Sequence, residues 1–286
     1  MLGLISYFAK TDIHPSLKAE PLFDIGPLTV TNSMLYGLVT SILIILIMVV
    51  AARRIKVESR KGFAQFIEMI TEFIIGLLEG VFGSRKQAAK FAPIFGTFFI
   101  FIIFNNILGI LPWAGHAVTY STAEGAVPLF RAFTADLNGT VALSVSAILL
   151  VQYLSIKEQG GKKHLQHYFS DKPFNPINFF IGILEVFGEL TRIMSLSLRL
   201  FLNTAVGEIL ILVFTSLIAA NGRTPLAAIP IILFELLVAG IQAYVFAVLA
   251  ATYLSLAISH SDDHSHNEKN HDIIDTPKKV EGAVGS

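Results

Sequence analysis

The sequence contains no cysteine and little charge. Of its 286 residues, 15% are Asp, Glu, Lys or Arg, and their formal charges sum to zero. The absence of cysteine excludes disulfides and thiol chemistry, although it leaves the cellular compartment open. The absence of net positive charge removes the electrostatic argument for nucleic-acid binding, so we expect no nucleic-acid partner.

The sequence is rich in apolar residues. They make up 53% of the chain, and the mean hydropathy is +0.66. They also cluster: 33–52 and 91–111 are uncharged runs of twenty and twenty-one residues. A run of about 20 apolar residues spans the roughly 30 Å hydrocarbon core of a bilayer. The sequence therefore predicts an integral membrane protein whose surroundings include the lipid bilayer.

The apolar runs predict an all-α fold with one membrane domain, residues 33–259. We expect five transmembrane helices, near 33–52, 91–111, 137–156, 175–220 and 226–259. Residues 1–32 are interpreted as an extended extracytoplasmic segment. Residues 260–286 are interpreted as a flexible tail, because they are polar and lack periodicity. The tail contains several histidines for which metal binding is conceivable, but the flexible interpretation is favoured and no metal site is predicted.

Residues 62–83 differ from the crossings. Gln65, Glu68, Glu72 and Glu79 recur at helical spacing among Phe, Ile and Leu. This pattern favours a helix lying in the membrane surface. The alternative is a sixth crossing whose glutamates face a helix bundle, at the cost of charges inside the bilayer.

The loop charges predict an orientation. Lys and Arg concentrate in 53–61, 85–90 and 157–172, which share one side if 62–83 does not cross. The positive-inside rule makes that side cytoplasmic. We therefore expect the N-terminus outside and the C-terminus in the cytoplasm. Because no transit peptide is evident, a bacterial plasma membrane is the predicted location, although an organelle-encoded copy would also lack one.

The last two apolar segments are unusually long. About 45 helical residues in 175–220 extend over roughly 68 Å, twice the hydrocarbon thickness. Such a helix must tilt steeply, bend or break. Together with 226–259 it predicts a steeply tilted hairpin.

The first of these long segments carries a stripe of polar residues. At about 100° per residue, Glu185, Glu189, Arg192, Arg199 and Asn203 fall within a sector about 80° wide, whereas Glu208 lies about 140° from Glu185. An ionisable group at the bilayer centre costs on the order of 2.5–3.5 kcal/mol. These side chains must therefore face water, a partner or one another.

Two arginines of the stripe receive different interpretations. Arg192 lies at helical spacing from Glu185 and Glu189, so internal pairing and a functional role both remain open for it. Arg199 lies too far along the helix from any carboxylate of the stripe for a direct pair. It is predicted to meet a carboxylate from another element or another chain.

The last segment adds Glu235, Gln242 and Tyr253, which fall on one helical face. A buried Gln or Tyr is often no more than a satisfied hydrogen-bonding group. A buried glutamate without an adjacent cation is rarer, and it is a candidate for proton exchange.

These residues resemble a known family. Ser195-Leu-Ser-Leu-Arg199-Leu-Phe-Leu-Asn203, followed by Gly207-Glu208, resembles the signature of subunit a of F-type ATP synthases. The pattern from Glu235 through Gln242 to Tyr253 resembles the last helix of that family. Asp136-Leu-Asn138-Gly-Thr140 and Ile183-Leu-Glu185 add further agreement.

The resemblance implies a proton-translocating stator subunit with two offset half-channels. Arg199 would face the carboxylates of a c-subunit ring, with Asn203 and Gln242 close to it. Glu208 and Glu235 match the outer half-channel, and Glu185 matches the inner one. Other possible channel-lining residues are Asp136, Asn138, Glu189, Arg192 and Tyr253. Some members carry an acid and a histidine where this chain has Glu208 and Glu235, which leaves the order of proton hand-off open.

The resemblance also implies partners: the c-ring, peripheral-stalk b subunits and, indirectly, the F1 head. It implies no cofactor and no catalytic activity by the chain alone. Two rival functions were weighed. A proton-coupled secondary transporter is disfavoured because no internal repeat is evident. An intramembrane protease would need a paired serine and histidine or two aspartates at membrane depth, and the sequence offers neither.

Overall fold

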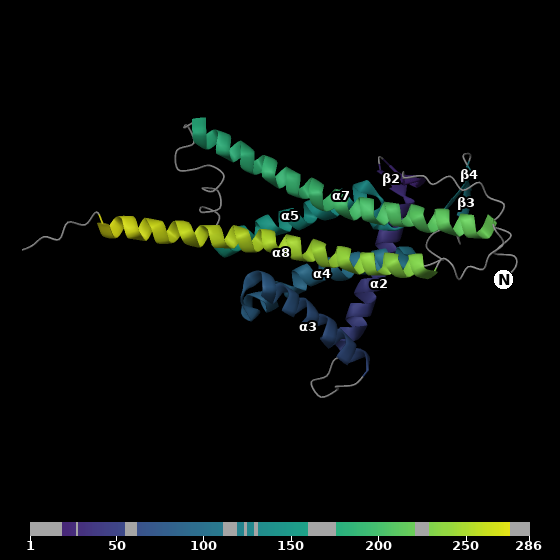
Figure 1. Ribbon diagram of the computed structural model, residues 1–286, viewed down its shortest axis with the longest axis horizontal. Coiled ribbons are helices and arrows are strands. Elements are labelled where there is room, and N and C mark those ends of the chain that lie inside the picture. The colour runs from purple at the N-terminus through teal and green to yellow at the C-terminus, as the bar shows by residue number, and fades with distance from the viewer. Residues whose placement is uncertain are drawn as a thin grey trace, which may run out of the picture.

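A computed structural model describes residues 19–26, 28–54, 62–110, 119–122, 125–128, 131–159, 176–220 and 229–274. The elements in chain order are β1 (Pro21–Ile25), β2 (Leu28–Thr31), α2 (Asn32–Arg54), α3 (Phe63–Phe82), α4 (Arg85–Ile110), β3 (Thr119–Thr122), β4 (Gly125–Pro128), the 3-10 helix η1 (Phe133–Ala135), α5 (Leu137–Gln159), α7 (Pro176–Ala220) and α8 (Ile229–Ile274). Figure 1 shows their arrangement.

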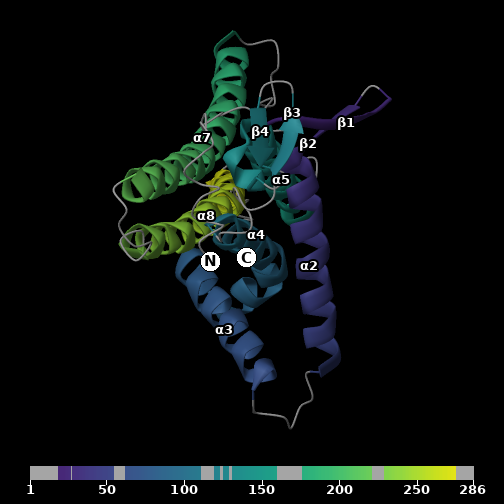
Figure 2. The same cartoon turned by 90° about the vertical axis from the view of Figure 1, so that its right-hand side faces the viewer.

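The described part of the chain is dominated by helices. Five of its helices, α2, α4, α5, α7 and α8, are long and apolar enough to cross a membrane. The two longest, α7 and α8, run antiparallel along the long axis of the molecule, and α2 stands across them (Figures 1 and 2). The sequence-based prediction of an all-α membrane protein with five candidate crossings is confirmed at this level.

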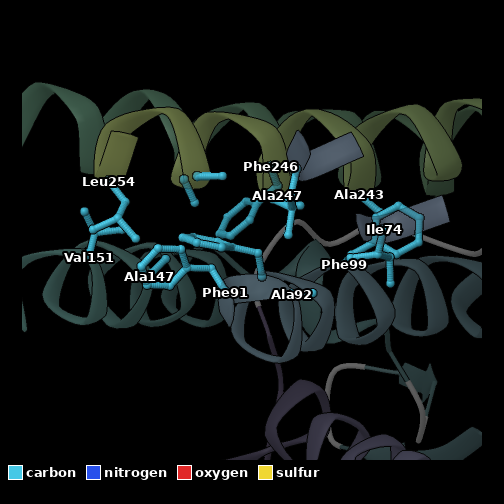
Figure 3. Close-up of a cluster of buried hydrophobic side chains, with 14 of the residues drawn as sticks. Ile74, Phe91, Ala92, Phe99, Ala147, Val151, Ala243, Phe246, Ala247 and Leu254 are labelled. Atoms are coloured by element: carbon cyan, nitrogen blue, oxygen red, sulfur yellow. The ribbon is translucent and has the colours of Figure 1, made fainter. Parts of the chain in front are cut away.

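The core lies where α8 packs on α3, α4 and α5. On α4, Phe91, Phe95, Phe99 and Ile102 are buried at spacings of three and four residues, which places them on one helical face. The facing side of α8 is built mostly from buried alanines, including Ala243, Ala247, Ala250 and Ala251, with Phe246 and Leu254 between them (Figure 3). Small residues let helix backbones approach closely in a membrane protein. This interface therefore fixes α8.

Helix α3 has one buried side and one exposed side. Ile74 and Leu78 are buried in the core cluster, whereas Phe66, Met69 and Phe73 are exposed. Two of its glutamates, Glu72 and Glu79, form ion pairs with Arg85 at the surface. The bounds of α3 agree closely with the expected segment 62–83.

Two short β-hairpins are a feature that the sequence analysis missed. β1 pairs antiparallel with β2, and β3 pairs antiparallel with β4, in segments interpreted as an extended leader and a loop. Both hairpins lie at the N-terminal end of α2 (Figures 1 and 2). Strands of four or five residues leave too short an alternating pattern to stand out. The first reversal occurs at Gly26, whose φ of 63° is readily adopted by glycine.

Two helix boundaries also differ from the expected ones. Helix α4 begins at Arg85 and not near 91, and α8 continues to Ile274 through part of the segment 260–286 that was interpreted as a flexible tail. Once a helix is nucleated, each added residue gains a backbone hydrogen bond without a new nucleation cost. Polar residues therefore extend these helices beyond their apolar runs.

The segment 131–136 is held tightly between helices. A Cβ atom at Gly37, Gly109 or Gly139 would lie 2.6 to 2.8 Å from atoms of Phe133 or Ala132. These three glycines belong to α2, α4 and α5. Because these glycines have no side chain, η1 fits closely against the three helices. It also contacts α7. This arrangement places the residues that flank η1 beside the middle of the bundle.

The alanine face of α8 generates a stability prediction. Replacing Ala250, which has no exposed surface, with Leu is expected to destabilise the protein by about 1–3 kcal/mol, because the added side chain overpacks the interface with α4. The thermal midpoint in detergent micelles measures the effect. Ala142→Leu, at an exposed position of α5, is the matched control and is expected to leave the midpoint unchanged. Equal midpoints for the two variants would contradict the packing described here.

Candidate functional site

Arg199 lies in the middle of α7 on a face that none of the other described helices covers. Its side chain is exposed, and it forms no hydrogen bond or ion pair with any residue that the structure describes. On the opposite side of the same turns, Leu196, Ser197 and Leu200 are buried. The packing of α7 on α5 and α8 therefore leaves the guanidinium pointing out of the described fold.

The surface around Arg199 is apolar. Met194, Leu198, Leu202 and Val206 of α7 are all exposed, by 39% to 57%. In Figure 2, α7 and α8 form one edge of the molecule, with the other helices on one side of them. On α8, Leu233, Leu237 and Ile241 are exposed at intervals of four residues. The guanidinium is thus one charge in a broad apolar face.

An amide pair joins α7 and α8 one turn beyond Arg199. The Asn203 Nδ2 donates to Gln242 Oε1 over 3.5 Å, and Gln242 is buried. The resemblance implies that both side chains lie close to Arg199; the structure shows that they contact each other. This hydrogen bond joins the two long helices about one turn after Arg199.

A first ionic cluster lies on the N-terminal side of Arg199. Arg192 Nη1 donates to Glu189 Oε1 over 2.7 Å, and the Arg192 guanidinium lies 5.0 Å from the centroid of the Tyr253 ring. The internal pairing that was left open for Arg192 is therefore present. We call Glu189, Arg192 and Tyr253 the Arg192 cluster. Glu185, one turn before Glu189, is half-buried and also has an interaction partner.

A second ionic cluster lies on the C-terminal side of Arg199. The Nε atom of Arg131 lies 3.6 Å from Glu208 Oε2, and Arg131 Nη2 donates to the carbonyl oxygen of Ala135 over 3.2 Å. Tyr36 of α2 is close enough for an electrostatic interaction with Glu208. Because Glu208 points away from the stripe that carries Arg199, it reaches the segment 131–136.

Glu235 of α8 completes this second cluster. Its carboxylate occupies the place that a Cβ atom at Gly207 would need, so it lies against the backbone of the residue that precedes Glu208. Glu235 is buried and forms no ion pair with any other residue of the described ranges. We call Tyr36, Arg131, Glu208 and Glu235 the Glu208 cluster.

The sequence analysis missed Arg131. It is the only Lys or Arg between residues 91 and 156. A lone arginine in a stretch that otherwise has no basic residue is the signal that could have found it. Its side chain is only 8% exposed, and a buried guanidinium requires a partner.

Asp136 and Asn138 lie together at the start of α5. Asp136 is buried, accepts a hydrogen bond of 2.6 Å from the Ser33 hydroxyl and caps α5 by accepting one of 3.0 Å from the Asn138 backbone N–H. Asn138 is exposed. Both residues line an open pocket of about 430 Å³ beside the β1–β2 hairpin. One carboxylate oxygen of Asp136 therefore connects the start of α5 with α2 through Ser33, and the other caps α5.

The fold and the site define a class of protein. The chain is a multi-pass α-helical membrane protein with ionisable side chains arranged along one long helix, grouped before and after an exposed arginine. It belongs to the ATP synthase A chain family, whose profile matches residues 34–255.

Individual relatives agree with this assignment. ATP synthase subunit a of Anaeromyxobacter dehalogenans is 31% identical over 79% of this chain and 57% of its own length, and that of Desulforamulus reducens is 32% identical over 82% and 81%. The Moorella thermoacetica protein is 31% identical over 82% of this chain and 94% of its own length. The chain therefore spans little more than half of the first relative and most of the other two.

The geometry at Asp136 generates a second stability prediction. Asp136→Ala is expected to cost about 1–3 kcal/mol, because it removes the cap of α5 and the hydrogen bond that the buried Ser33 hydroxyl donates to Asp136. Thermal unfolding in detergent measures the cost. Asn138→Ala, at the exposed neighbour, is the control and is expected to change the midpoint little. A midpoint for Asp136→Ala as high as that of the control would contradict the capping role.

Proposed function

We propose that this chain is the proton-translocating stator subunit of a rotary F-type ATP synthase. Family membership supports the proposal. The observation that carries it is Arg199, a guanidinium exposed on an apolar face and without an ionic or hydrogen-bonding partner in the described fold. Such a group is stabilised in a membrane when a partner subunit brings a carboxylate to it.

The two ionic clusters correspond to two half-channels. Along α7, Arg192 precedes Arg199 by seven residues, about 10 Å, and Glu208 follows it by nine, about 14 Å. The Arg192 cluster, with Glu185, would line the inner half-channel. The Glu208 cluster, with Asp136 and Asn138 toward the pocket, would line the outer one. Asn203 and Gln242 lie between the outer cluster and the arginine.

The arginine keeps the half-channels separate. A guanidinium does not deprotonate at accessible pH, so it does not relay protons, and its charge repels a cation that would pass directly from one channel to the other. A carboxylate of the c-ring releases its proton to one channel opposite Arg199. It is protonated again from the other channel before it returns to lipid. Proton flow is thereby coupled to rotation of the ring.

The helix lengths support a proposal for how α7, α8 and α3 lie in the membrane. A 45-residue helix such as α7 is about 68 Å long and fits a bilayer of about 30 Å only if it tilts steeply or bends. We propose that α7 and α8 form a steeply tilted hairpin against the ring. Helix α3, with exposed Phe66, Met69 and Phe73 and exposed glutamates, would lie in the membrane surface.

The remaining features of the proposal concern topology and partners. The N-terminal segment would lie outside a bacterial plasma membrane and the C-terminal tail in the cytoplasm. The basic start of α4 and the end of α5 lie on the same side of the protein, because Lys90 pairs with Glu158. The partners would be the c-ring, the peripheral-stalk b subunits and, indirectly, the F1 head. The chain itself would carry no catalytic site and no cofactor.

Arg199→Ala tests the central role. In inverted membrane vesicles, ATP-driven acidification is expected to be lost although the complex still assembles, because Arg192, the other arginine of this stripe, is already paired with Glu189. Arg199→Lys is also expected to fail, since a buried ammonium loses charge more readily and lacks the planar fork. Arg85→Ala, at an exposed surface arginine, is the control and is expected to pump normally. Normal pumping by Arg199→Ala would refute the proposal.

Gly207→Ala tests the position of Glu235. The added methyl group would take the space of the Glu235 carboxylate, so we expect ATP-driven pumping to fall on the order of tenfold, as a small displacement of a reacting group often does. Gly76→Ala, where the added atom meets open space, is the matched control. Pumping by Gly207→Ala at the rate of Gly76→Ala would contradict a role for Glu235 at this place.

A further inference from the structure

Arg199 lies near one edge of the exposed side of α7. At about 100° per residue, the exposed Leu198 and Val206 lie about 100° and about 20° from Arg199 in one direction. The buried Leu196 lies about 60° from Arg199 in the other direction. A rotation of α7 by about 60° would therefore bring the guanidinium to the side on which Leu196 is buried. The direction in which Arg199 points depends on how α7 is turned about its own axis.

Apolar side chains define this rotation only weakly in a membrane. Leu196 and Leu200 are buried, and Leu198 and Leu202 are exposed. A leucine that moves from a helix interface into lipid loses little, because lipid tails are as apolar as leucine. Polar side chains that hydrogen-bond across helices add a directional contact, because the two atoms must meet within a narrow range of distance and angle.

One such hydrogen bond joins α7 to α5. The Ser197 hydroxyl donates to the Thr140 hydroxyl over 3.2 Å, and both residues are buried. The Thr140 hydroxyl donates its own proton to the carbonyl oxygen of Leu137 over 3.0 Å, and its backbone N–H donates to the carbonyl oxygen of Asp136. Thr140 is therefore held in the first turn of α5, where its hydroxyl oxygen accepts from α7.

Ser197 lies almost opposite Arg199 on α7. The two residues are two positions apart, which is about 200° around the helix. The hydrogen bond on the α5 side therefore turns Arg199 outward. Cα atoms lie about 2.3 Å from the helix axis, so a rotation of about 60° would move the Ser197 Cα atom by about 2.3 Å. A hydrogen bond of 3.2 Å does not survive such a displacement.

We propose that Ser197 is a positioning residue: its hydrogen bond to Thr140 sets the rotation of α7 that presents Arg199 to the ring. The proposal rests on the proposed function. In this role Ser197 acts through α7 and contacts neither the ring nor the transported proton. A single interhelical hydrogen bond in a membrane protein shifts an equilibrium about threefold on average. Its loss is therefore expected to shift the rotation of α7 while the helix stays folded.

Disulfide cross-linking to the ring measures this rotation in the assembled complex. Leu198→Cys and Val206→Cys are each combined with a cysteine beside the essential carboxylate of the ring subunit, and each yield is divided by the amount of assembled complex. The two positions lie about 80° apart around α7, so the ratio of their yields reports how the helix is turned. In Ser197→Ala this ratio is expected to change about twofold or more, and ATP-driven pumping per complex is expected to fall with it.

Three further variants separate the hydrogen bond from general packing. Thr140→Val removes the acceptor and is expected to change the ratio as Ser197→Ala does, with no additional change in the double variant, because both remove the same bond. Thr140→Ser keeps the hydroxyl and is expected to retain the original ratio. Ser144→Ala is the matched control, because Ser144 is buried one turn further along α5 and its hydroxyl forms no hydrogen bond with any described residue.

An unchanged ratio in Ser197→Ala would rule out the positioning role and leave the proposed function intact, even if less complex assembled. Equal ratios for Thr140→Ser and Thr140→Val would rule it out as well. If Ser197→Ala fails to accumulate, Thr140→Val supplies the same measurement with the same two interpretations. Absence of cross-linking from both positions in the otherwise unchanged chain would instead contradict the proposed function, because the ring would not lie on this face of α7.

Discussion

A charged guanidinium on an exposed apolar surface is the constraint around which this molecule is organised. Arg199 is exposed and has no ionic or hydrogen-bonding partner within the described residues, and an unpaired charge is costly in lipid. Helix packing keeps Arg199 exposed. Helix α8 packs through its alanine face on α4 and α5, and α7 buries Leu196 and Leu200 toward that core. The opposite face of α7 is left for a partner. In the proposed function that partner is a ring that brings carboxylates to the arginine in turn.

Two other arginines, Arg192 and Arg131, differ from Arg199 because each has an ionic partner inside the fold. Arg192 pairs with Glu189 and stacks on Tyr253, while Arg131 pairs with Glu208. Close approach makes these contacts possible: glycines at 37, 109 and 139 admit the segment that carries Arg131, and Gly207 admits the Glu235 carboxylate. In the proposed function, an ion pair on either side of Arg199 gives the separation that two half-channels require.

Much of this arrangement was predictable from local patterns. The apolar runs predicted the five candidate crossings, and the helical period predicted that Glu208 points away from the stripe that carries Arg199. Arg131 could not be predicted in the same way, because its pairing with Glu208 joins positions 77 residues apart and depends on how η1 is seated. The close approach of Glu235 to Gly207 is equally a matter of packing between helices. The two hairpins and the continuation of α8 to Ile274 were missed because short strands and polar helical turns lack a strong period.

Disulfide cross-linking tests the central claim most directly, because the chain has no native cysteine to interfere. Leu202 is 53% exposed on the same face as Arg199, whereas Leu149 is 64% exposed on α5. Leu202→Cys and Leu149→Cys are each combined with a cysteine beside the essential carboxylate of the ring subunit and then oxidised in membranes. If the ring lies against Arg199, position 202 gives a cross-linked product and position 149 gives none. Cross-linking from position 149 alone would contradict this placement, because the ring would then lie away from Arg199.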